Sequence, residues 1–121
     1  MKKKILVVDD EHDLRVILGS ELEEQGYSVA TAEDGEVAIH MLRGEHFDLI
    51  LLDNKMPRVD GFGVLKYVKE HHPTTKVIML TGFADLQNAI ESKKLKAEGF
   101  INKPYEFDKL LGTVERVLGE V

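Results

Sequence analysis

Short apolar runs alternate along the chain with segments whose apolar residues recur at helical spacing. The runs cover residues 5–8, 28–32, 49–52, 77–80 and 100–101. The first, third and fourth runs are continuous rather than alternating, which is typical of strands covered on both faces of a parallel sheet. The run at 28–32, SVATA, is less apolar and predicts a strand nearer an edge.

Four of the intervening segments carry a clear helical stripe of apolar residues. The stripes are Leu14, Ile17, Leu18 and Leu22, ending near Gly26; Val37, Ala38, Met41 and Leu42, before Gly44; Val64, Leu65 and Val68, before Pro73; and Phe107, Leu110, Leu111, Val114, Val117 and Leu118. A fifth segment, 84–95, has only Leu86, Ile90 and Leu95 as large apolar residues. It predicts a thinly anchored helix that is a candidate for movement.

Five alternations of strand and helix predict an α/β fold with a doubly wound parallel sheet. Right-handed crossovers then place helices on both faces of that sheet. The length of 121 residues suits one domain, residues 1–121, and the chain contains no repeat, low-complexity tract or linker.

Composition narrows the functional classes. The chain is 43% hydrophobic and 31% charged, its apolar runs are too short for a membrane span, and it has no cysteine for disulfides or thiolate metal sites. A net charge of −6 does not favour binding to nucleic acid without a basic patch, and Lys93, Lys94 and Lys96 are best interpreted as a solvated helix face. We expect a cytoplasmic protein that binds neither nucleic acid nor membranes directly.

Polar side chains follow four of the five predicted strands. They are Asp9, Asp10 and Glu11 after the first strand, Asp53 after the third, Thr81 after the fourth and Lys103 after the fifth. Taken singly, Asp9 or Asp10 could cap the first helix, and Thr81 could cap another. Because the carboxyl ends of parallel strands share one edge, however, these groups should converge there and form a site.

The residue types indicate the chemistry of this site. Three carboxylates held close together repel one another, so they require a positive partner. Oxygen ligands without His or Cys suit a hard divalent cation, Mg²⁺ first, and Lys103 adds a fixed positive charge. Asp53, at the end of a rigid strand, could then attack phosphorus and form an acyl phosphate, with cation, lysine and the Thr81 hydroxyl stabilising the phosphoryl oxygens.

Four stretches resemble one known family. The segments ILVVDDE, DLILLDNKMPRVDG, VIMLTG and GFINKP together resemble the receiver domain of two-component response regulators, in the CheY-like superfamily, from end to end. The resemblance implies a flavodoxin-like strand order of 2-1-3-4-5. It also implies a Lys103–Pro104 peptide bond in the cis form.

The same resemblance assigns roles to individual residues. It implies that Asp53 is the phosphoacceptor and that Lys103 pairs with the phosphoryl group. The implied Mg²⁺ ligands are Asp10, Asp9 (often through water), Asp53 and the backbone carbonyl of Lys55. Mn²⁺ could substitute for Mg²⁺. Thr81 would move to hydrogen-bond the phosphoryl oxygen beside Gly82, and Phe100 would turn inward with it as the switch aromatic. Ordinary core packing is the alternative for Phe100.

Some positions depart from the commonest family pattern without removing a reacting group. Asn54 takes a place that is often apolar, and Lys96 takes one where glycine is frequent. Lys55 and Phe83 stand where side chains often modulate attacking water. The Lys55 side chain could either steady the phosphoryl group or point to solvent.

The implied function is a phosphorylation-dependent signalling switch rather than an enzyme. The phosphoryl group would come from a phosphohistidine of a sensor histidine kinase or phosphotransfer protein. The response would change the surface over the fourth helix, fifth strand and fifth helix, where a homodimer or an output partner would bind.

Three other functions are compatible with a fold of this class. A haloacid-dehalogenase-type phosphohydrolase needs a second Asp where this chain has Lys55. A flavodoxin-like nucleotide binder needs a Gly/Ser/Thr-rich loop where this chain has DDEHD. A degenerate receiver that binds partners without phosphorylation stays open as the alternative. The histidines, at 12, 40, 46, 71 and 72, show no metal-ligand spacing and predict surface or helix-end positions.

Overall fold

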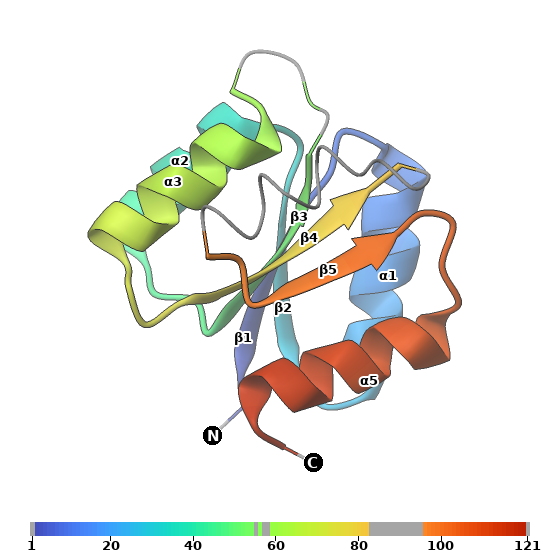
Figure 1. Cartoon of the computed structure of the whole chain (residues 1–121). Helices are drawn as coiled ribbons and strands as arrows, with labels where there is room; N and C mark the ends of the chain where they lie inside the picture. Colours follow the sequence, from blue (N-terminus) through green and yellow to red (C-terminus); the bar gives the residue numbers. More distant parts are fainter. Residues whose placement is uncertain (1, 55, 57–58, 83–95, 121) are drawn as a thin grey trace.

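Strands and helices alternate in the computed structural model, which describes residues 2–54, 56, 59–82 and 96–120 (Figure 1). The described elements are β1 (Lys4–Val8), α1 (His12–Glu24), β2 (Ser28–Ala32), α2 (Gly35–Gly44), β3 (Leu49–Asp53), α3 (Gly61–His71), β4 (Lys76–Thr81), β5 (Gly99–Asn102) and α5 (Phe107–Leu118). The predicted helix at 84–95 lies outside the described residues.

The described strands form one five-stranded parallel sheet in the order β2-β1-β3-β4-β5. This confirms the predicted strand order. It also confirms the edge position of the less apolar run, because β2 pairs with β1 alone among the described strands. The central strands pair in close register, with Val8 opposite Leu52 and Asp53 opposite Leu80, so their carboxyl ends stop at nearly the same level.

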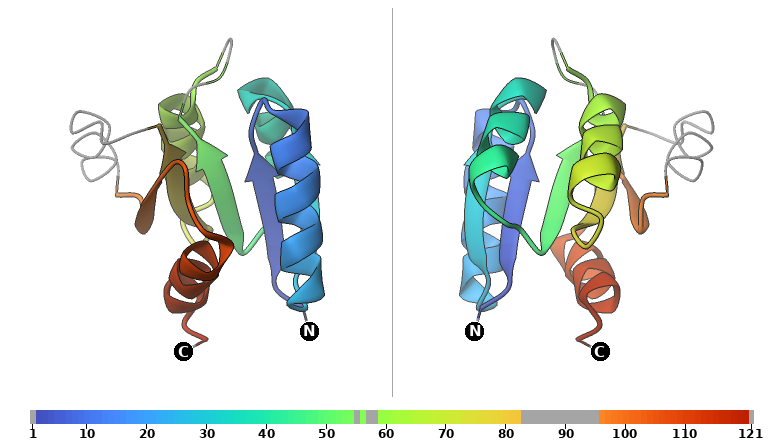
Figure 2. Two further views of the ribbon diagram at one scale, coloured as in Figure 1. Left: turned by 90° about the vertical axis from the view of Figure 1, so that its right-hand side faces the viewer. Right: turned by 90° about the vertical axis from the view of Figure 1, so that its left-hand side faces the viewer.

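Helices cover both faces of the sheet. Figures 1 and 2 show α1 and α5 on one face and α2 and α3 on the other. Successive side chains of a strand point to opposite faces, so each continuous run serves two cores. Ile5 and Val7 belong to the core on the α1/α5 side, and Leu6 and Val8 belong to the core on the α2/α3 side. Burial on both faces explains why these runs do not alternate with polar residues.

The predicted stripe of α1 was wrong at one position. Leu18 and Leu22 are buried and Leu14 packs against them, but the side chain of Ile17 is 60% exposed. The buried residues recur every four positions along the sheet, and Ile17 lies roughly 100° around the helix from Leu18. The predicted end of this helix is confirmed, since α1 stops at Glu24 and Gly26 follows with a left-handed φ of 98°.

Among the described residues, no helix combines the length and apolarity that a membrane crossing needs.

Candidate functional site

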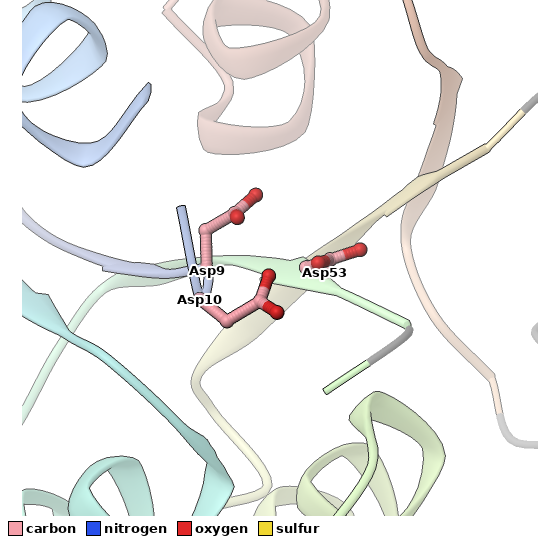
Figure 3. A group of neighbouring side chains, drawn as sticks. All are labelled: Asp9, Asp10 and Asp53. Carbon is pink, nitrogen blue, oxygen red and sulfur yellow. The ribbon is translucent and has the colours of Figure 1, made fainter. Parts of the chain in front are cut away.

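Three carboxylates meet where β1 and β3 end. Asp9, Asp10 and Asp53 each offer an oxygen, and these oxygens lie within 4.8 Å of one another (Figure 3). The parallel pairing of β1 with β3 produces this grouping, because Val8 and Leu52 are register partners and the acids come directly after them in each strand. Asp9 and Asp53 are buried, whereas Asp10 is exposed.

Asp9 is held by bonds on both sides of its carboxylate. Its Oδ1 accepts a hydrogen bond from the Glu11 backbone N–H at 2.9 Å, and its Oδ2 accepts one from Lys103 Nζ at 2.7 Å. Arg15 Nη1 also donates to the Asp9 carbonyl at 2.7 Å. The residue at the N-cap of α1 is Glu11, which makes no side-chain cap bond, so neither Asp9 nor Asp10 is the cap that their sequence position allowed.

Lys103 supplies the positive charge. Its Nζ atom lies 2.7 Å from Asp9 Oδ2 and 3.6 Å from Asp53 Oδ1, with 18% of the side chain exposed. Burial alone would lower the pKa of Lys103, but the Asp9 hydrogen bond and the charges of Asp53, Asp9 and Glu11 raise it above the ordinary value. The lysine is therefore a fixed cation. Its peptide bond to Pro104 is cis, as the family resemblance implies.

Asp53 is held by the backbone on either side of it. The next residue, Asn54, donates its N–H to the Leu80 carbonyl at 3.1 Å and accepts from the Gly61 N–H at 3.3 Å. Gly61 opens α3, and a Cβ atom there would lie 2.3 Å from the Asp53 carbonyl oxygen. Asp60 caps α3 through a 2.9 Å bond to the Gly63 N–H. The Asp-Gly pair thus lets α3 start directly against the strand end that carries Asp53.

The predicted switch residues lie on neighbouring strands. Thr81 ends β4, is fully buried, and donates from its Oγ1 to the Gly82 carbonyl at 3.2 Å. Phe100 lies in β5 opposite Met79, where it is half-buried against the core on the α2/α3 side. Lys55 and Phe83 lie outside the described residues.

Tyr105 is a site neighbour that the sequence interpretation missed. It lines a hollow beside the lysine together with Glu11, Leu14, Lys103 and Pro104. Burial and the nearby carboxylates of Asp9, Glu21 and Glu11 raise the pKa of Tyr105 to about 12, so its hydroxyl stays protonated at neutral pH. Its position directly after the Lys-Pro pair was the available signal.

The donor set fits a divalent cation. The cluster offers only carboxylate oxygens, two from buried residues and one from an exposed residue that leaves a side open to solvent. Oxygen ligands with room for water are what Mg²⁺ prefers. Among the described residues, Lys103 lies within 4 Å of two of these three acids, Asp9 and Asp53. Three neighbouring carboxylates can therefore accommodate a further positive charge.

The class of protein now follows from sheet order and site together. Residues 5–115 match the family model described as "Response regulator receiver domain". This chain belongs to that family, and is the receiver domain of a response regulator in two-component signalling.

Curated relatives show the same membership. The chain is 35% identical over 115 residues to Regulatory protein AtoC of Escherichia coli K12, covering 95% of this chain and 25% of AtoC. It is 38% identical over 120 residues to the probable transcriptional regulator ycf27 of Porphyridium aerugineum, covering 99% of this chain and 50% of that protein. The chain thus spans a quarter to a half of the length of these relatives.

Solved structures share the fold. A CheY-like receiver domain protein from Methanospirillum hungatei superposes with a TM-score of 0.94 at 32% identity, covering 99% of this chain and 96% of that one. The response regulator protein TrrA of Thermotoga maritima, solved in complex with Mg²⁺ and BeF, gives a TM-score of 0.86 at 35% identity, covering 95% and 98%.

Proposed function

We propose that this domain is a Mg²⁺-dependent switch that accepts a phosphoryl group on Asp53 from a phosphohistidine of a sensor histidine kinase or phosphotransfer protein. The observation that carries the proposal is the position of the Lys103 ammonium, hydrogen-bonded to Asp9 and 3.6 Å from Asp53. A lysine in this position can contact an oxygen of any group transferred to Asp53. Family membership supports the same assignment.

The reaction is an exchange of one bond to phosphorus for another. An Oδ atom of Asp53 attacks phosphorus, the P–N bond of the phosphohistidine breaks, and the imidazole nitrogen leaves with the electron pair. Asp10 and Asp53 would hold Mg²⁺ directly, and Asp9 would hold it directly or through water. The Lys55 carbonyl would be a further ligand, and Mn²⁺ could take the place of Mg²⁺. The bound cation would offset negative charge on the acids and on the phosphoryl oxygens.

Lys103 and Thr81 would bind the transferred group. The ammonium pairs with one phosphoryl oxygen, since it is charged and already faces Asp53. The Thr81 hydroxyl, now donating to Gly82, would exchange that bond for one to another phosphoryl oxygen. Phe100, only half-buried in this arrangement, would turn further inward as Thr81 moves.

The output would be a change of surface rather than turnover of a substrate. A few kcal/mol of preference for the phosphorylated arrangement is enough to invert two populations. We propose the surface over β5, α5 and the segment that the sequence predicts as the fourth helix as the place where a homodimer or output partner binds. The domain then acts in the cytoplasm as a switch and not as an enzyme, without contacting nucleic acid or membrane itself.

The test is phosphoryl uptake from acetyl phosphate, measured by intact mass with and without Mg²⁺. We expect one phosphoryl group on the parent chain with Mg²⁺ and little without it. Asp53→Asn should abolish uptake, while Asp60→Asn, which changes a helix cap near the site, should retain it. Equal labelling without metal, or full labelling of Asp53→Asn, would contradict the proposal. No labelling of the parent chain with or without Mg²⁺ would favour a degenerate receiver.

A further inference from the structure

The side chain of Asn54, the residue after the proposed phosphoacceptor, is buried with an unsatisfied acceptor. Asn54 is 4% exposed, and its Oδ1 is the one fully buried side-chain polar atom among the described residues without a hydrogen-bond partner. A buried acceptor that has left water without finding a donor destabilises the state that contains it. Asn54 therefore disfavours the arrangement described here.

The backbone around Asn54 cannot easily move to relieve this. Its N–H is bonded to the Leu80 carbonyl, and its carbonyl is bonded to the Gly61 N–H. A Cβ atom at Gly61 would lie only 2.6 Å from the Asn54 Cα, so the first turn of α3 already lies against this residue. A donor for the amide oxygen must therefore come from a change in the groups around Asn54.

An apolar side chain would avoid the destabilisation altogether. Leucine branches at the same carbon as asparagine and places no acceptor at the position of the unsatisfied Oδ1. An unsatisfied group beside the reacting residue is explained if a second state of the domain satisfies it.

We infer that Asn54 is a positioning residue that narrows the free-energy gap between the two states of the switch. Its amide oxygen lacks a partner in the unmodified state and gains one when the site is loaded with Mg²⁺ and a phosphoryl group. This inference rests on the proposed function, because the second state is the phosphorylated one.

The experiment compares thermal unfolding of the whole chain, metal-free and loaded with Mg²⁺ and beryllofluoride. The variants are Asn54→Leu and the smaller Asn54→Val, with Asn102→Leu as control, since Asn102 is exposed at the end of β5. We expect at least one Asn54 variant to melt higher than the parent without metal. We expect beryllofluoride to raise the melting temperature of that variant by less than it raises that of the parent. The concentration that gives half of this rise should be about tenfold higher, which is equivalent to about 1.4 kcal/mol.

Each result decides the matter. If both Asn54 variants melt below the parent without metal, the amide is satisfied in the unmodified state and the inference is wrong. If the melting temperature of a variant exceeds that of the parent by the same amount with and without beryllofluoride, the amide oxygen lacks a partner in both states. The switching role is then overturned. A parent chain that gains nothing from Mg²⁺ and beryllofluoride contradicts the proposed function itself, and the inference falls with it.

Discussion

Lys103 donates a 2.7 Å hydrogen bond to Asp9 and thereby joins the chain after β5 to the chain after β1. These two strands are not neighbours, because β3 and β4 lie between them in the sheet. Asp9 is fully buried, so the lysine compensates a carboxylate that water cannot reach. The lysine therefore offsets the cost of burying the Asp9 charge.

Replacing Lys103 with Met should destabilise the metal-free domain by about 2–4 kcal/mol, because it leaves the buried Asp9 carboxylate without its cation. Mg²⁺ should restore part of the loss, since it supplies positive charge to the same acids. Urea unfolding with and without Mg²⁺ measures both effects. Lys109→Met, at an exposed position of α5, is the control and should change little. Equal stability of Lys103→Met and parent without metal would refute the compensating role.

Asp10→Asn should stabilise the metal-free domain, in contrast to Lys103→Met. Asp10 is exposed but lies within the group of three acids, so removing its charge relieves repulsion on Asp9 and Asp53. We expect a higher melting temperature than the parent in a chelating buffer and a much smaller gain on adding Mg²⁺. Asp13→Asn, in the first turn of α1, is the control. A full gain with Mg²⁺ in Asp10→Asn would show that Asp10 is not a metal ligand.

Gly61→Ala should destabilise the domain by about 3 kcal/mol or more, because the new Cβ would lie 2.3 Å from the Asp53 carbonyl and a backbone must move. The same substitution at Gly112, in α5, meets no atom within 4 Å. Gly112→Ala should therefore stabilise by about 0.5–1 kcal/mol through helix propensity alone. Urea midpoints of the two variants test the opposite signs. A mild effect at Gly61 would mean that α3 can start further from β3.

The gathering of the site could be predicted because it depends on topology. Once the continuous runs indicate parallel strands, every strand ends at one edge, and the acids, Thr81 and Lys103 are brought there whatever the loop details. The edge position of β2 was predicted separately, from its weaker hydrophobicity. Helical spacing alone was less informative, since a stripe three and four residues apart admits both Ile17 and Leu18, and only packing on the sheet decides between them.

Contacts that depend on tenths of an ångström could not be predicted from the sequence. The sequence did not show that Lys103 would hydrogen-bond Asp9, or that Tyr105 would line the hollow beside the lysine. Both contacts depend on the conformation of the loop after β5. The sequence also marked Asn54 only as unusual. That its Oδ1 is buried without a hydrogen-bond partner depends on packing that the sequence does not reveal.

Lys96→Gly should stabilise the domain by up to about 1 kcal/mol. Lys96 is exposed and has a φ of 65°, a conformation that costs an L-residue about 1–2 kcal/mol but glycine almost nothing. Part of this gain is offset by the greater freedom of glycine in the unfolded chain. Lys66→Gly, at an exposed position inside α3, should instead destabilise by about 1 kcal/mol. Urea unfolding compares the two, and loss of stability at Lys96 would argue against the left-handed turn.

Tyr27 links the start of β2 to the end of the described chain. Its hydroxyl donates a 2.7 Å bond to Glu120 Oε1, and the side chain is 7% exposed. Burial, the bond to Glu120 and the charges of Glu120 and Glu115 raise the pKa of Tyr27. Tyr27→Phe should therefore lower stability at neutral pH by about 1 kcal/mol, because it removes the hydrogen bond from the Tyr27 hydroxyl to Glu120.

The same contact predicts how this stability difference depends on pH. The folded state keeps the Tyr27 proton at a pH where the unfolded chain, with a pKa of about 10, has lost it. The contribution of Tyr27 is thus fully present below about pH 10 and decreases as the pH rises toward the folded pKa. Unfolding free energies of the parent and Tyr27→Phe, measured from pH 7 to 11, should converge above pH 10. Glu120→Gln keeps an acceptor for the Tyr27 hydroxyl but removes the negative charge. The unfolding free energy of this variant should therefore decrease less than that of the parent as the pH rises above 10. A constant gap across this range would mean that Tyr27 ionises equally in both states.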